Sequence, residues 1–256
     1  MAERSRGRPP KYPPEEVRLR LLEAGREVLL RHGPGCGLDP VTLDGAIAEA
    51  DVPRGSAYRL WQDDALAPQQ KFRQAVQLDL LTRVGTGVPS ATAQFKETYE
   101  EYAEFAQSED QLEREWAFRT ILRLVANHSN DRLSKSRTWR VYQALRSNVV
   151  AKANPREAAI EAVRRAEAIQ IEAYAAMYSE IAKVYRIRIR EPYTMQEFAT
   201  SAFALNEGIA ARVGDGFRRR IDRKTGRNGE AEEWTLFAIG LEALADHYFE
   251  PTEYAA

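Results

Sequence analysis

The sequence predicts an all-α protein, with an N-terminal three-helix domain followed by a helical bundle. Apolar residues recur at steps of 3 and 4 through most of the chain, as they do on one face of a helix. No strand-like alternation interrupts these stretches. A length of 256 residues, 44% of them hydrophobic, is enough for one large or two small domains with a buried core.

The composition excludes several classes of protein. Lys and Arg number 37 against 38 Asp and Glu, so the net charge of -1 excludes polyanion binding through an overall positive field. The single cysteine, Cys36, cannot form an internal disulfide, and with three scattered histidines it cannot build a zinc site. It is either incidental or an oxidation sensor. No apolar stretch approaches 18 residues, and the first 14 residues do not resemble a signal peptide. We expect a soluble, cytoplasmic protein without metal or cofactor.

The N-terminal region predicts one long helix followed by two short ones. Helical spacing indicates a first helix over 15–32, which ends at Gly33-Pro34-Gly35. Thr42 can cap a second helix because its hydroxyl accepts from amides of the first turn. Asp51-Val52-Pro53 breaks that helix, and a third runs from Arg54 to about Trp61. Asp63 or Asp64 caps a fourth helix, which continues to about Leu80.

The remainder predicts long helices separated by polar breaks, over 92–107, 111–127, 131–152, 156–189, 194–213 and 231–249. Asn127, His128 and Asn130 are interpreted as capping and loop residues at a helix end. The helix over 156–189 is apolar almost all round its middle, which favours a position inside the bundle. Residues 214–230, rich in Gly and Arg, are predicted to form an exposed loop, either solvated or in contact with a partner.

The stretch Thr42–Trp61, TLDGAIAEADVPRGSAYRLW, has the parts of a helix-turn-helix. Such a motif needs a first helix braced against the nucleic-acid backbone, a short turn and a second helix that enters a major groove. Arg54, Ser56 and Ala57 begin the second helix, where side chains reach base edges, and Tyr58 and Arg59 reach phosphates. Asp51 stands where the turn requires a left-handed backbone. Spacing alone also allows two short helices of an ordinary α domain.

These residues resemble the TetR family of one-component transcriptional regulators. The resemblance covers about residues 15–80 and rests on Ala24, Gly33, Thr42, Ala50, Val52, Arg54, Gly55, Ser56, Tyr58 and Arg59. It implies a flexible arm over 1–14, a DNA-binding domain over 15–64, and a ligand-binding and dimerisation domain over 65–256. It further implies a DNA-binding regulator, by family default a repressor. The predicted DNA-contacting residues are Arg6, Arg8, Thr42, Arg54, Gly55, Ser56, Ala57, Tyr58, Arg59 and Trp61.

The charge near the motif departs from what DNA binding favours. Residues 13–64 carry a net charge of -4, from 6 Arg and 10 Asp or Glu, and Asp64 stands near the position of a phosphate-contacting Lys in many family members. The arm RSRGRPPKYPP offsets this with a charge of +3 in the first 12 residues. Its prolines favour an extended backbone, so Arg6 and Arg8 can insert into a minor groove. A solvated tail is the alternative.

The resemblance also implies a homodimer that presents two recognition helices to a near-palindromic operator. In the family the last two helices of each protomer pair across the axis, which here matches 194–213 and 231–249. The predicted interface residues are Phe198, Ala202, Leu205, Ile209, Phe237, Leu241 and Leu244. The alternative is that these residues face only their own core.

A small-molecule effector pocket inside the C-terminal bundle is likewise implied by the resemblance. Its candidate residues are large side chains of the middle helices: Tyr99, Tyr102, Trp116, Phe118, Trp139, Tyr142, Tyr174, Met177 and Tyr178. Aromatic residues at helical spacing can equally belong to the core. The sequence does not identify the ligand. We expect only that it favours a second conformation of the protein and so releases it from DNA.

Two other classes compete with a regulator. An all-helical enzyme is disfavoured because the sequence holds no His-Glu-x-x-His, Gly-x-Ser-x-Gly or phosphate-cradling glycine loop. A helical scaffold or adaptor with a non-functional helix-turn-helix is the main alternative, because the local charge of -4 opposes DNA binding.

Overall fold

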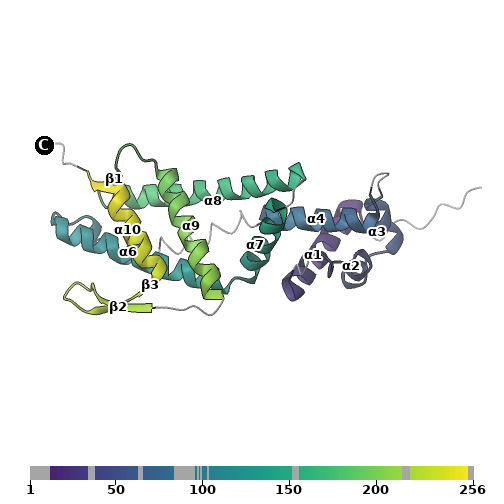
Figure 1. Cartoon of the computed structure of the whole chain (residues 1–256), viewed down its shortest axis with the longest axis horizontal. Coiled ribbons are helices and arrows are strands. Elements are labelled where there is room, and N and C mark those ends of the chain that lie inside the picture. The colour runs from purple at the N-terminus through teal and green to yellow at the C-terminus, as the bar shows by residue number, and fades with distance from the viewer. Residues whose placement is uncertain are drawn as a thin grey trace, which may run out of the picture. The chain divides into compact units, whose positions relative to one another are not determined.

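The computed structural model describes residues 12–33, 38–62, 66–83, 96, 98, 100–102, 104–151, 156–214 and 220–252. Over these residues the chain is mainly helical, with a few short strands (Figure 1). It divides into two compact units. Unit 1 comprises Met1–Val84 and Arg137–Arg164, and unit 2 comprises Gly85–Ser136 and Arg165–Ala256.

Unit 1 is built from helices around one apolar core. These are α1 (Pro14–His32), α2 (Leu43–Ala50), α3 (Arg54–Leu60), α4 (Pro68–Arg83), α7 (Arg137–Val150) and the first turns of α8 (Glu157–Val184). The largest core side chains are fully buried, among them Leu21, Leu29, Phe72 and Leu80. The first three predicted helices are therefore confirmed. The packing also takes in α7 and the start of α8, which lie far along the chain from the others.

The helices α1 and α4 approach each other closely at Gly25. A Cβ atom at this position would lie 2.6 Å from Cγ2 of Val76 and 3.1 Å from Cζ of Phe72. Next to it, the partly buried pair Arg26 and Asp79 joins the same two helices through a 3.0 Å hydrogen bond. Because glycine has no side chain, it lets the two backbones pack at this point.

Unit 2 packs α6 (Gln111–Lys135), the rest of α8, α9 (Met195–Gly214) and α10 (Leu236–Tyr248) around a second core. Two small antiparallel sheets flank it: β1 (Ile187–Ile189) pairs with β4 (Phe249–Pro251), and β2 (Arg220–Lys224) pairs with β3 (Ala231–Thr235). α6, α9 and α10 contact one another (Figure 1).

The predicted break between residues 127 and 131 is wrong, because α6 runs without interruption to Lys135. Asn127 and Asn130 lie inside this helix, and their side chains bond to other elements. Asn127 accepts from the Thr235 amide at 2.9 Å, and Asn130 donates to Asn206 at 2.9 Å. Polar residues in a row often mark the end of a helix. Here their side chains bond to other elements instead, so the helix continues through them.

The expectation of no strands is also wrong. The helix predicted to reach residue 189 ends at Val184, because Arg186 takes a left-handed backbone with φ of 53° and the chain continues as β1. Part of the predicted loop 214–230 is β2, in which Ile221 lies opposite Trp234 of β3. The two arginines of β2 form ion pairs: Arg220 binds Asp131 and Glu233, and Arg223 binds Glu242. The alternation of exposed and half-buried residues in β2 spans only five positions of a basic stretch, which is too short to predict a strand.

No described helix is both long enough and apolar enough to cross a membrane.

Candidate functional site

The turn between α2 and α3 has the predicted helix-turn-helix geometry. The Thr42 hydroxyl accepts a hydrogen bond from the Gly45 amide at 3.1 Å and so caps α2. Asp51 ends α2 in the left-handed region, with φ of 50° and ψ of 47°. Val52, which follows, is buried in the core of unit 1. The cap, the left-handed residue and the short second helix are all confirmed.

The short helix α3 has one buried face and one exposed face. Arg54, Gly55 and Arg59 are exposed, and Ser56 and Tyr58 are half-buried. The side chain of Arg54 keeps 69% of its surface exposed. Among the residues predicted to contact DNA, these five and Thr42 therefore lie where a partner can reach them.

Ala57 and Trp61 are corrected, because both belong to the core and cannot contact a base. Ala57 is 0% exposed and Trp61 is 2% exposed. The indole of Trp61 packs edge to face against Phe72, with 5.5 Å between ring centroids, and the Arg18 guanidinium lies over it at 5.2 Å. Residues three and four positions apart lie on the same face of a helix. Trp61 follows Ala57 by four positions, so it lies on the same buried face.

Asp44 of α2 engages two exposed side chains of α3. Its carboxylate lies 3.2 Å from the Arg54 guanidinium and accepts a 2.9 Å hydrogen bond from the Tyr58 hydroxyl. Arg54 also lies over the Tyr58 ring, 5.2 Å from its centroid. Sequence reasoning missed this contact, because an acid in the first turn of a helix is also expected from the helix dipole. The exposed face of α3 therefore carries the Asp44 carboxylate next to the positively charged Arg54.

Several predicted residues lie outside the described part of the chain. They are Arg6 and Arg8 of the arm, Cys36, the capping candidates Asp63 and Asp64, and Tyr99 of the predicted pocket.

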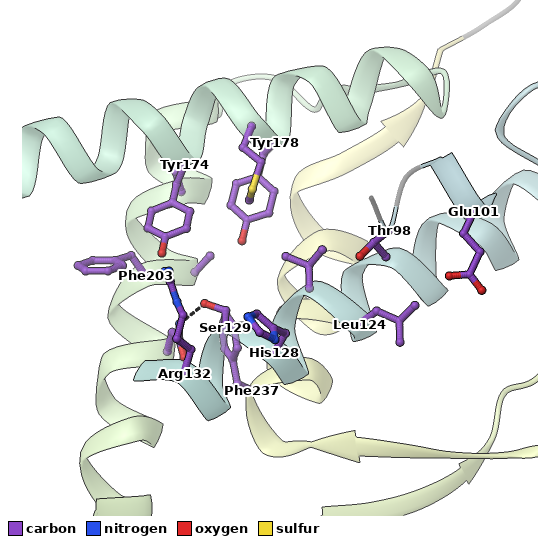
Figure 2. Close-up of a pocket in the computed structure, with 15 residues that line it drawn as sticks. Thr98, Glu101, Leu124, His128, Ser129, Arg132, Tyr174, Tyr178, Phe203 and Phe237 are labelled. Carbon is purple, nitrogen blue, oxygen red and sulfur yellow. Dashed lines mark hydrogen bonds between the residues drawn. The ribbon is translucent and has the colours of Figure 1, made fainter. Parts of the chain in front are cut away.

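Unit 2 contains a cavity of about 280 Å³ between α6, α8, α9 and α10 (Figure 2). Its apolar lining includes Leu124, Met177, Ala202, Phe203 and Phe237, and its polar lining includes Glu101, His128, Ser129, Arg132, Tyr174, Tyr178 and Asn206. Figure 2 shows the rings of Tyr174 and Tyr178 projecting from α8 toward Ser129 and His128 of α6. The cavity therefore has an apolar wall and a set of hydrogen-bonding groups.

A chain of polar groups forms one side of the cavity. Asn130 donates to Asn206 at 2.9 Å, and Asn206 donates to the Ser129 hydroxyl at 3.0 Å. The Tyr174 hydroxyl interacts in turn with Ser129 and Arg132. Burial raises the pKa of Tyr174, and it raises the pKa of Tyr178 well above the ordinary value. Like ordinary tyrosines, both phenols are protonated at neutral pH and can donate hydrogen bonds.

The cavity takes in three of the residues proposed for an effector pocket, Tyr174, Met177 and Tyr178. The other candidates that the structure describes lie elsewhere. Trp139 and Tyr142 are corrected, because they are buried in unit 1. Tyr102 and Trp116 pack against each other with 5.9 Å between centroids, and Phe118 packs against Tyr185 at 5.8 Å. His128, Ser129 and Asn206 were missed, since single polar residues on a helix carry no pattern that marks a pocket.

Four residues predicted for a dimer interface are instead core residues of unit 2. Phe198, Ala202, Phe237 and Leu241 are at most 3% exposed within one protomer. Ala202 and Phe237 line the cavity. The stripe was read correctly as apolar, but its partner is the protomer's own core. Leu205, Ile209 and Leu244 are half-buried.

Within the described residues, no group of three or more His, Cys, Asp or Glu side chains is placed to hold a metal ion.

No protein-family model matches the chain, and no curated protein matches it. Among solved structures, it is similar to a candidate TetR-family transcriptional regulator from a Rhodococcus species, at 15% identity and a TM-score of 0.45, over 79% of this chain and 89% of that one. It is similar to another from Vibrio parahaemolyticus, at 15% identity and a TM-score of 0.42, over 91% and 99%. A protein of unknown function from Rhodococcus sp. RHA1 is 18% identical with a TM-score of 0.46, over 90% and 92%. Values this low transfer no function.

Proposed function

We propose that this chain is a TetR-like transcriptional regulator that binds DNA through α3. The observation that carries the proposal is the two-faced character of α3. Ala57 and Trp61 fix its inner face to the core, while Arg54, Gly55 and Arg59 face outward. A short helix held in this way on a left-handed turn is the arrangement with which a helix-turn-helix enters a major groove about 12 Å wide.

The exposed side chains divide by reach into two groups. Arg54 and Ser56 stand at the start of α3, where a helix lying in the groove contacts base edges. Tyr58 and Arg59 follow, and their longer side chains suit phosphates. Thr42 stands at the start of α2, where the helix amides and dipole favour a phosphate. The arm arginines Arg6 and Arg8 are proposed to add minor-groove contacts.

The protein is further proposed to act as a homodimer through the outer faces of α9 and α10. Exposed small residues, Ala204, Gly208 and Ala243, lie there beside half-buried Leu205 and Leu244. Small residues allow two helices to approach closely, and the half-buried leucines have surface left to cover. A dimer would present two α3 helices about one DNA turn apart. Sedimentation of Leu244→Arg, with Val150→Arg on α7 as the control, tests this surface.

Regulation is proposed to come from a ligand in the unit 2 cavity, with repression as the default mode. A ligand can move such a switch only by as much as its affinities for the two states differ. Release from the operator therefore requires a conformation of the dimer that the ligand favours and DNA does not.

A gel-shift series with genomic fragments at several salt concentrations tests the DNA-binding proposal. We expect saturable binding that weakens steeply with salt, because phosphate contacts release counterions. Arg59→Ala is expected to lower the slope of log affinity against log salt by about 1. Arg140→Ala, which removes an exposed arginine of α7, is the matched control. An unchanged slope in Arg59→Ala would remove that residue from the interface. Deleting residues 1–12 tests the arm in the same way.

A scaffold or adaptor without DNA binding is the second candidate, favoured by one observation. Asp44 holds Arg54 and Tyr58 on the face that would meet DNA, within a region whose net charge is -4. A protein that binds no duplex at low salt, while remaining folded, would support this candidate over the regulator.

A further inference from the structure

The hydroxyl of Tyr178 is a polar group of the cavity that makes no hydrogen bond to any described residue. The side chain is 5% exposed, and Figure 2 shows its hydroxyl directed from α8 into the cavity, toward α6. Among the residues that the structure describes, none hydrogen-bonds to it. Its ring is held in place by Phe198, edge to face, with 4.8 Å between centroids. The hydroxyl is thus fixed in position and left without an acceptor.

The neighbouring polar groups are already engaged. The Ser129 hydroxyl accepts from Asn206, and Tyr174 interacts with Ser129 and Arg132. A buried hydroxyl without a partner is unfavourable, because water is lost and nothing replaces it. The Tyr178 hydroxyl carries a proton at neutral pH, and the group that satisfies this donor is a hydrogen-bond acceptor.

The rest of the lining indicates what carries that acceptor. Leu124, Met177, Ala199, Ala202 and Phe237 form an apolar wall. Beside it, the rings of Phe203 and Tyr174 pack against each other, with 5.6 Å between centroids and a tilt of 33° between their planes. Flat apolar surfaces of this kind favour a planar apolar body.

The charged lining favours a neutral ligand. Among the described lining residues, one carboxylate, Glu101, and one guanidinium, Arg132, carry opposite charges that balance. A ligand with a net charge would gain attraction from one of these groups and repulsion from the other, while losing its own hydration.

We propose that the cavity binds a planar, neutral and largely apolar small molecule whose carbonyl oxygen accepts a hydrogen bond from Tyr178. The proposal deepens the proposed function and rests on it only in identifying this molecule as the effector. Tyr178 is then the residue that sets specificity, because a site with a buried donor rejects a ligand that leaves the donor unpaired.

Isothermal titration calorimetry of the full-length protein with two probes of matched shape tests this. The probes are 2-acetylnaphthalene, which has a carbonyl oxygen, and 2-isopropenylnaphthalene, which has a methylene group in its place. We expect the ketone to bind about tenfold more tightly, the effect of one hydrogen bond. Equal affinities, or binding of neither probe, would overturn the proposal. A third probe, 2-naphthoate, tests the charge: tighter binding than the ketone would overturn the neutral class.

The variant Tyr178→Phe keeps the ring and removes only the donor. It is expected to bind both naphthalenes equally, through loss of ketone affinity. Tyr142→Phe, which removes a hydroxyl from a buried tyrosine of unit 1, is the matched control and is expected to keep the tenfold preference. A preference that survives in Tyr178→Phe would overturn the assignment of this residue.

The two levels of proposal can fail separately. A protein that shifts operator DNA but shows no ketone preference would retain the regulator function and lose the ligand class. A protein that prefers the ketone through Tyr178 but binds no duplex would retain the ligand class and lose the regulator. Ketone binding that leaves the gel shift unchanged would show that the ligand is not the effector.

Discussion

The two units bury different kinds of side chain. In the described part of unit 1, the interior is formed by apolar residues, and Gln77 is its buried polar residue. Unit 2 buries a larger polar set: Arg114, Thr120, Arg123, Asn130, Ser134, Gln170, Asn206 and Thr235. Buried polar groups require fixed partners, whereas apolar packing tolerates several arrangements. Unit 2 is thus built to hold polar groups around a space, whereas the apolar interior of unit 1 needs no such network.

This difference explains where each candidate site lies. In unit 1 the functional groups are on the outside, and the core serves only to fix α3. In unit 2 they are inside, where α6, α8 and α9 bring Tyr174, Tyr178, Ser129 and Asn206 together. Substitutions that separate folding from binding can therefore test the contrast.

The largest expected effect is that of Trp61→Ala in unit 1. Because Trp61 is 2% exposed and packs on Phe72, its truncation is expected to lower the free energy of unfolding by about 3–5 kcal/mol. Urea denaturation followed by circular dichroism measures this. Arg59→Ala, two residues earlier and exposed, is the control and is expected to change stability by less than about 0.5 kcal/mol. If both variants changed the free energy of unfolding by the same small amount, Trp61 would not be a core residue.

The approach of α1 and α4 predicts the next effect. Replacing a helical glycine by alanine ordinarily stabilises a helix by about 1 kcal/mol. Gly25→Ala is expected to destabilise instead, by about 1–3 kcal/mol, because its Cβ would lie 2.6 Å from the buried Val76. Gly55→Ala, where no atom lies within 4 Å of the added Cβ, is the control and is expected to leave stability unchanged or raised. Urea denaturation of both variants compares them, and stabilisation by Gly25→Ala would contradict the close packing.

The same contrast governs how far the sequence could predict this structure. In unit 1 the signals were local: Thr42 caps from its own helix, and Asp51 takes the left-handed turn because of its own side chain. Such features depend on a few neighbouring residues and were predicted correctly. Trp61 was misplaced because its orientation depends on contact with α4, which follows in the chain.

In unit 2 the decisive contacts join residues far apart in the chain. Asn127 and Asn130 read as a helix end, since their partners Thr235 and Asn206 are remote and cannot be inferred from spacing. The strand β1 was missed because its partner, β4, lies about sixty residues later. The tyrosines of the cavity were found by size and helical position. The polar chain that faces them was not found.

The polar chain itself predicts a third effect. Asn206→Ala removes the acceptor of Asn130 and the donor to Ser129. Because a buried amide is then left unsatisfied, the free energy of unfolding is expected to fall by about 1–3 kcal/mol. Asn148→Ala, which changes an exposed asparagine of α7, is the control and is expected to have little effect. Urea denaturation that cannot distinguish the two variants would mean that the polar chain adds nothing to stability.

The smallest expected effect concerns the surface of unit 1, where Asp44 faces the residues proposed to meet DNA. Asp44→Asn removes one negative charge from this face, and the amide oxygen can still accept from Tyr58. Removing repulsion of about 1 kcal/mol between the carboxylate and a nearby phosphate is expected to tighten duplex binding about fivefold at low salt. Gel shifts at two salt concentrations measure the change, which is expected to shrink as salt rises.

Glu23→Gln on α1 is the matched control, because it also neutralises an exposed acid but lies on another helix. If both variants gain equally, the effect is one of net charge and Asp44 has no special place. If Asp44→Asn instead weakens binding, the carboxylate must position Arg54 for the groove. The benefit of orienting Arg54 would then exceed the repulsion between the carboxylate and the phosphate. The sign of this one change therefore decides whether the carboxylate opposes the surface that α3 presents or organises it.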